Sequence, residues 1–388
     1  MFDYASRLDG LTGNAIREIF KLLAVPDLIS FAGGLPSRES FDPGLVGRTA
    51  VELMEKNGYA LMQYGATEGW GPLLESLRGF LAGQGLQFEA DEVLPTAGSM
   101  QAFDLLCRAL LNPGDVVLVE DPTFLGALHT LRLSQAQVLG VPLEDDGIAL
   151  TALEEKIVKE KPKFIYLIPT FQNPTGITMS LAKRRAVANM AAKYKVLIAE
   201  DDPYRDLRYT GDALPPIASF GHGGYVIYLG SFSKIISPGL RVGYAAGNAG
   251  LIRKMTIVKQ GADTHSPLLN QAIVDSIIRQ GLLPCMIKNA CAGYEKQLNA
   301  MLAGLEKIPA LKYTKPQGGL FVWAELPEGA DALELLPRAV EKGVAFIPGT
   351  HFYCDGGHAN TMRLNFSACP PETITRGTQI LRQVLAQQ

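Results

Sequence analysis

The run KVLIAEDDPY at residues 195–204 is a strong indication of the fold class of this chain. Residues 195–200 are almost continuously apolar, as expected for a parallel β-strand that is covered on both faces. Asp201 follows at once, and a carboxylate at the end of a buried strand is costly unless it has a cation or a hydrogen-bond donor beside it. The run predicts a central strand with Asp201 facing a ligand. The alternative is that Asp201 or Asp202 only caps a turn through Asp-Pro.

Similar apolar runs, separated by helix-compatible stretches, lie on both sides of this strand in the sequence. Such alternation of strands and helices is typical of an open α/β sheet. The other strands are expected at VVLVE 116–120, KFIYLIP 163–169 and YVIYLG 225–230, and the helices at 99–111, 125–134, 151–160 and 181–194.

After about residue 280 the pattern changes to a long helical segment at 287–307, two strand-like runs (LKYT and GLFVWAEL), a helix from about 332, the strand MRLNFS and a final helix. We therefore predict a large α/β domain at 45–280 and a smaller α+β domain at 281–388. Residues 1–44 are expected to join the small domain and the active site.

Composition excludes several classes of function. The 388 residues include 36 basic and 39 acidic side chains, so no charge surplus favours nucleic acid. No apolar run approaches the roughly 18 residues that a membrane helix needs, and the N-terminus lacks a signal-like apolar segment. The five cysteines form no C-x-x-C motif and the five histidines are scattered, so no metal site is expected. A cytoplasmic protein that binds small molecules is predicted.

Polar residues follow each strand, at the edge where open α/β sheets bind ligands. Gly98-Ser99 opens a helix and could receive a phosphate, with the hydroxyls of Ser231 and Ser233 and the cation of Arg241 as further donors. Taken singly, each of these groups is compatible both with ligand binding and with an ordinary place in a turn, in the core or in a solvated loop.

One ligand accounts for the whole set. Pyridoxal 5′-phosphate has a phosphate, a basic ring nitrogen for Asp201, a phenolic oxygen for Tyr204, a planar ring for Phe124 and an aldehyde for Lys234. A lysine amine that forms a Schiff base with such an aldehyde is an established mode of covalent catalysis.

Four strings in this order resemble the class I and II aminotransferases, which have fold type I of the pyridoxal-phosphate enzymes: NPTG at 173–176, EDDPY at 200–204, SFSKIISPGLRVGY at 231–244 and MRLNFS at 362–367. The segment IREIFKLL…LISFAGGLPSRESFD further resembles the branch with 2-aminoadipate, kynurenine and aromatic aminotransferases. The resemblance implies a large domain with a mainly parallel, seven-stranded type of sheet between helices.

The resemblance also implies roles for individual residues. Lys234 would be the Schiff-base lysine and would move the proton between substrate Cα and the cofactor. Asp201 would pair with the ring nitrogen, Asn173 and Tyr204 would hold the phenolic oxygen, and Phe124 would stack on the ring. The candidates for the phosphate region are Gly98, Ser99, Gln101, Ser231, Ser233 and Arg241.

For the substrate, the resemblance implies that Arg363 binds the α-carboxylate, with Asn173 nearby. Gly33 and Gly34 would let the backbone approach the substrate. Tyr64 would come from a partner subunit, which implies a homodimer with shared active sites. Arg17 could contact the distal carboxylate of glutamate or 2-aminoadipate, or could simply be a solvated helix residue.

The function expected from this resemblance is transfer of an amino group from an L-amino acid to a 2-oxo acid through pyridoxamine phosphate, with glutamate and 2-oxoglutarate as one pair. A β-eliminating lyase of the same fold is an alternative. A ligand-sensing regulator is a further alternative, disfavoured because the motifs begin near residue 30 and leave too little chain for a DNA-binding module.

Overall fold

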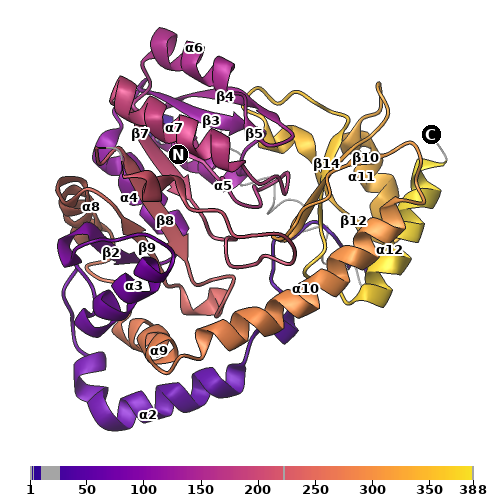
Figure 1. Ribbon diagram of the computed structural model, residues 1–388. Coiled ribbons are helices and arrows are strands. Elements are labelled where there is room, and N and C mark those ends of the chain that lie inside the picture. The colour runs from indigo at the N-terminus through magenta and orange to yellow at the C-terminus, as the bar shows by residue number, and fades with distance from the viewer. Residues whose placement is uncertain (1, 3, 10–26, 222, 387–388) are drawn as a thin grey trace.

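The computed structural model describes residues 2, 4–9, 27–221 and 223–386. Its centre is an eight-stranded sheet in the order β2-β9-β8-β7-β6-β3-β4-β5 (Figure 1). The strands are β2 (Val93–Thr96), β3 (Val116–Asp121), β4 (Gln137–Glu144), β5 (Gly147–Ile148), β6 (Phe164–Leu167), β7 (Leu197–Asp201), β8 (Val226–Ser231) and β9 (Gly243–Ala246).

The four strands expected from apolar runs are confirmed as β3, β6, β7 and β8, which pair in parallel as neighbours in the sheet. β9 runs antiparallel to both β8 and β2. The sheet has one strand more than the seven expected, because β5 adds two residues in an antiparallel hairpin with β4. Two-residue strands have no periodicity that sequence inspection can detect.

Helices cover both faces of this sheet, as the continuously apolar strands require. Successive residues of β3 and β6 enter different hydrophobic clusters: Val117 and Phe164 belong to one, whereas Leu118 and Ile165 belong to the other. The helices of this part are α2 (Pro43–Leu61), α3 (Gly71–Gly83), α4 (Ser99–Leu110), α5 (Leu125–Leu133), α6 (Leu150–Glu160), α7 (Leu181–Tyr194), α8 (Ala249–Ala262) and α9 (Leu268–Arg279).

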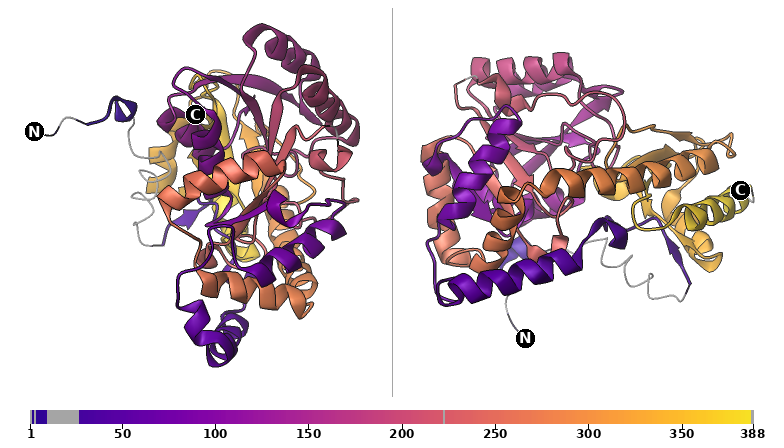
Figure 2. Two further views of the ribbon diagram at one scale, coloured as in Figure 1. Left: turned by 90° about the vertical axis from the view of Figure 1, so that its left-hand side faces the viewer. Right: turned by 60° about the horizontal axis from the view of Figure 1, so that its bottom comes forward.

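A second, smaller sheet lies beside the first, in the order β10-β11-β14-β13. Its neighbours are antiparallel, and the long helix α10 runs from the end of α9 towards it (Figures 1 and 2). The elements are α10 (Leu283–Leu305), β10 (Lys312–Tyr313), β11 (Phe321–Glu325), α11 (Ala332–Glu341), β12 (Val344–Ala345), β13 (Ile347–Pro348), β14 (Thr361–Asn365) and α12 (Pro371–Leu385).

The segment before α2 is attached to the C-terminal part of the chain. Its strand β1 (Ile29–Ser30) pairs in parallel with β12. The Asn365 amide also donates to the Phe31 carbonyl at 2.7 Å, which brings the FAGG segment against β14. The expected division at 44 and 280 stays a prediction, but these contacts agree with a joining role for the N-terminal segment.

None of the helices in the described part of the chain is long and apolar enough to cross a membrane. Within the same residues, no group of three or more histidine, cysteine, aspartate or glutamate side chains could hold a metal ion.

Candidate active site

Asp201 ends β7 in the centre of the large sheet and is 4% exposed. Its Oδ2 accepts a hydrogen bond of 2.6 Å from the Tyr166 hydroxyl, while Oδ1 is buried with no partner among the described residues. Burial raises the pKa of Asp201 to about 7, although the Tyr166 hydrogen bond opposes this shift. A buried carboxylate oxygen without a partner indicates a missing cationic or hydrogen-bond-donating group.

A chain of hydrogen bonds joins three of the expected residues next to this aspartate. Arg363 Nη1 donates to Asn173 Oδ1 at 2.9 Å, and Asn173 Nδ2 donates to the Tyr204 hydroxyl at 3.3 Å. All three side chains are buried. The structure therefore brings together residues from β14, the NPTG turn and the loop after β7.

Arg363 is 1% exposed, yet within the described ranges it forms no ion pair with an acidic side chain. Its Nη2 donates to the Ala32 carbonyl at 2.7 Å, and its Nε has no partner. The guanidinium lies over the rings of Phe321 and Phe352, at 4.2 and 5.0 Å from their centroids. A buried cation without a counter-charge is costly, so the arrangement suits an anionic ligand.

Lys234 lies in the same region, in the loop after β8. Its Nζ donates to the Gly34 carbonyl at 3.0 Å, which also places the FAGG segment at the site. Burial, together with the positive charges of Arg363 and Arg241, lowers the pKa of Lys234 to about 8. A larger share of neutral amine at neutral pH makes this lysine a better nucleophile.

The protein groups that could bind a phosphate lie around the start of α4. Ser231 Oγ donates to Ser233 Oγ at 2.9 Å, and Arg241 Nη1 donates to Ser233 Oγ at 3.4 Å. Arg241 Nη2 donates to the Ala97 carbonyl at 2.7 Å, next to Gly98. Gly98 is followed by Ser99, the first residue of α4, whose leading amides have no partner within the helix.

Gln101 differs from the other phosphate candidates, because its amide already has protein partners. Its Oε1 accepts from the Ala97 amide at 2.7 Å and from Lys259 Nζ at 3.2 Å, and its Nε2 donates to Asp263 Oδ2 at 2.6 Å. The Gln101 side chain thus supports the turn before α4, and the place of Gln101 in the phosphate region stays a prediction.

Phe124 is half-buried directly before α5, and an added Cβ on Gly126 would collide with its ring. Gly33 is buried and Gly34 half-buried in the FAGG segment. Tyr64 lies on the surface, 82% exposed, with its ring edge-on to His265 at 6.0 Å. Arg17 lies outside the described residues.

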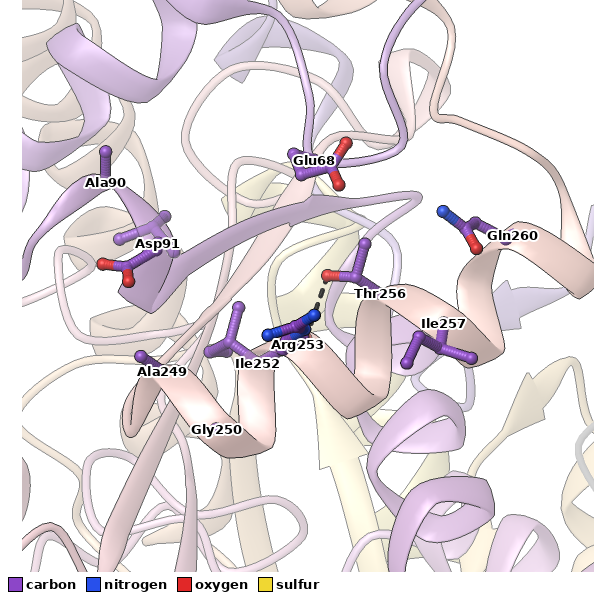
Figure 3. Close-up of a pocket in the computed structure, with 11 residues that line it drawn as sticks. Glu68, Ala90, Asp91, Ala249, Gly250, Ile252, Arg253, Thr256, Ile257 and Gln260 are labelled. Carbon is purple, nitrogen blue, oxygen red and sulfur yellow. Dashed lines mark hydrogen bonds between the residues drawn. The ribbon is translucent and has the colours of Figure 1, made fainter.

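A pocket of about 620 Å³, lined by residues of α8 and by Val93 of β2, is separate from this site. Figure 3 shows that it lies along α8, with Glu68 and Asp91 on its opposite wall. None of the expected site residues lines it, so it contributes nothing to the chemistry of Asp201 and Lys234.

A comparison with protein families identifies this arrangement. The family described as aminotransferase class I and II matches residues 33–381, which is most of the chain. The chain belongs to this family.

Individual aminotransferases resemble the chain over nearly its full length. Aromatic-amino-acid aminotransferase 1 of Thermococcus litoralis is 39% identical over 393 residues, covering 99% of this chain and 94% of that protein. A 2-aminoadipate transaminase of Thermus thermophilus is 40% identical over 380 residues, covering 97% and 94%. The structure of a Pyrococcus horikoshii kynurenine aminotransferase in complex with pyridoxamine phosphate has a TM-score of 0.95 and 39% identity, covering 99% of this chain and 97% of that one.

This aminotransferase is accordingly a pyridoxal-phosphate enzyme of fold type I. Its own residues fit the cofactor in chemical kind. The unpartnered Asp201 oxygen suits a protonated ring nitrogen, the Lys234 amine suits an aldehyde, and the hydroxyl and guanidinium groups near Gly98 suit a phosphate.

Sequence inspection misses three residues of the aminotransferase site. Tyr166 is simply part of an apolar strand in the sequence, although in the structure it holds Asp201. Phe321 and Phe352 surround Arg363, but aromatic residues in strands and loops are usually core packing. A tyrosine within the otherwise apolar run FIYLIP is the one available signal, since a buried phenol hydroxyl needs a partner.

Proposed function

We propose that this aminotransferase moves the amino group of an L-amino acid to a 2-oxo acid, with glutamate and 2-oxoglutarate as one pair. The observation that carries the proposal is Arg363, a buried guanidinium with a free Nε and no acidic partner among the described residues. Amino acids and 2-oxo acids share the carboxylate that such a group binds. Neutral Asn173 beside it adds an amide that can orient the same carboxylate.

Lys234 is proposed to form a Schiff base with the cofactor and to act as the proton carrier. When bound, pyridoxal phosphate supplies an aldehyde that condenses with amines and a cationic ring that withdraws electrons from the substrate Cα. With substrate and cofactor bound, the Lys234 amine would hold and move the proton between the substrate Cα and the cofactor. Its lowered pKa keeps it available as a base near neutral pH.

The remaining residues are proposed to hold the cofactor. Asp201 pairs with the ring nitrogen, Asn173 and Tyr204 bind the phenolic oxygen, and Phe124 stacks on the ring. The phosphate region is formed by Gly98, Ser99, Gln101, Ser231, Ser233 and Arg241. We further propose a homodimer in which Tyr64 completes the site of the partner subunit, in agreement with its exposure in the single chain.

The relatives are named for aromatic amino acids, 2-aminoadipate and kynurenine, so these donors are the first to test after glutamate. The contribution of Arg17 to a distal carboxylate and the cytoplasmic location stay predictions from the sequence.

The absorption spectrum of the protein loaded with pyridoxal phosphate tests the proposal. Adding L-glutamate without an oxo acid should replace the band of the lysine-bound cofactor with that of pyridoxamine phosphate and release 2-oxoglutarate in equal amount. Lys234→Ala should lack the lysine-bound band, whereas Lys254→Ala, a change of an exposed lysine on α8, should behave as the parent does.

Each other outcome has a definite meaning. A spectrum that ignores glutamate but changes with an aromatic or 2-aminoadipate donor would exclude the glutamate pair and retain amino transfer. Release of pyruvate and ammonia from a β-substituted alanine, without pyridoxamine phosphate, would favour the β-eliminating lyase instead.

A further inference from the structure

Tyr166 lies in β6, next to β7 in the centre of the sheet, and is 1% exposed. The parallel register places Tyr166 opposite Ala199. Because side chains alternate along a strand, Asp201 lies on the same face as Ala199, two residues further on. The Tyr166 side chain therefore reaches along this face to Asp201, where its hydroxyl donates to Oδ2 at 2.6 Å.

This hydrogen bond makes the two oxygens of Asp201 different. Oδ2 has the tyrosine as its donor, and Oδ1 is buried without a partner among the residues that the structure describes. Oδ1 is therefore the oxygen that still needs a hydrogen bond from a bound group. The phenol thus selects which oxygen is available and fixes the plane of the carboxylate.

We propose that Tyr166 is a positioning residue for the cofactor: its hydroxyl holds Asp201 as an anion with Oδ1 directed to the ring nitrogen of pyridoxal phosphate. This inference rests on the proposed role of Asp201. In this role Tyr166 influences cofactor binding only through the contact between Asp201 and the ring nitrogen.

The surroundings of Tyr166 support this role. Burial and, to a smaller extent, the adjacent Asp202 raise the pKa of Asp201, while the Tyr166 hydrogen bond opposes them, and together these contributions place the pKa at about 7. The pKa of Tyr166 itself is well above its ordinary value because of burial and the nearby Asp201 charge, so the phenol keeps its proton and stays a donor. The Phe103 ring, 4.6 Å from the Tyr166 ring, packs against it.

The chain contains a matched control in another strand of the same sheet. Tyr228 in β8 is also 1% exposed, and its hydroxyl donates to the neighbouring carboxylate, Asp202, at Oδ2 over 3.3 Å. Tyr228→Phe removes the same hydroxyl from an equally buried tyrosine bonded to an aspartate. The two changes differ in the aspartate that loses its hydrogen-bond donor: Asp201 in Tyr166→Phe, and Asp202 in Tyr228→Phe.

The test measures binding of two ligands to the apoprotein by titration. One is pyridoxal phosphate, and the other is its carbocyclic analogue, in which C–H replaces the ring nitrogen and the aldehyde, phenol and phosphate are kept. Tyr166→Phe should weaken pyridoxal phosphate binding about tenfold, the order expected for losing a hydrogen bond to a charged group. The same variant should bind the analogue as tightly as the parent or more tightly, because a less anionic Asp201 is easier to bury against C–H. Tyr228→Phe should change neither affinity by more than about twofold.

Several results would overturn the inference. Equal weakening of both ligands by Tyr166→Phe would show a general structural effect, and no weakening of either would show no role. If the parent protein bound no pyridoxal phosphate, or bound it as weakly as the analogue, the proposed cofactor site itself would fail.

Discussion

At the residue scale, Lys234 has an amine whose pKa is set by burial and by two cations, Arg363 and Arg241, rather than by an acidic partner. Only the neutral amine attacks an aldehyde, so the rate at which the apoprotein captures pyridoxal phosphate should rise with pH and level off above about 8. An unperturbed lysine would show a rate that rises until about 10.5. Stopped-flow absorbance over this pH range distinguishes the two, and a rise that continues past about pH 9 would contradict the assignment.

At the scale of elements, the turn into α4 combines an unusual backbone conformation with a close side chain. Gly98 has φ 90° and ψ 166°, a region that only glycine occupies readily, and an added Cβ would lie 2.6 Å from Arg241 Nη2. Gly98→Ala should therefore displace both the free amides of α4 and the arginine, and weaken pyridoxal phosphate binding by about five- to 150-fold, which corresponds to a strain of about 1–3 kcal/mol.

Gly79→Ala in α3 is the control for this change, because nothing lies within 4 Å of its added Cβ. Alanine in a helix interior is favoured over glycine by about 0.5–1 kcal/mol, so this variant should melt slightly higher and bind pyridoxal phosphate normally. Equal affinities of the two variants, measured by fluorescence titration of the apoproteins, would rule out a phosphate role for the turn.

At the scale of the whole molecule, the exposed apolar side chains near the end of α2 suggest a surface that a second subunit covers. Tyr59, Met62 and Tyr64 are 99, 72 and 82% exposed. Helix α2 lies at the periphery of the molecule, against α9 (Figures 1 and 2). In the proposed homodimer, a chain that lacks Lys234 still donates its Tyr64 to the other site.

Hybrid dimers test this sharing of sites. Lys234→Ala and Tyr64→Ala should each be nearly inactive as homodimers. A purified hybrid of the two, carrying different tags, should contain one intact site and recover about half of the parent activity. A hybrid no more active than either homodimer would mean that Tyr64 serves its own chain or neither.

The order and kind of most elements could be predicted from the amino-acid sequence. Long apolar runs such as 116–120 and 195–200 are covered strands, and the polar residues directly after them meet at one edge of the sheet. Such patterns depend only on residues that are neighbours in the sequence. They were sufficient for the large sheet and the cofactor, but not for the two-residue strand β5.

Which polar atoms remain without a partner depends on the tertiary structure. Tyr166 and Asp201 are 35 residues apart, Asn173 and Arg363 190, and Gly34 and Lys234 200. Nothing in the sequence says that Gln101 turns to Lys259 and Asp263, or that Arg363 is buried without an acid among the described residues. A residue type fixes what a side chain can bond, whereas packing between distant segments fixes what it does bond. The ligand chemistry is set by the groups that remain without a partner.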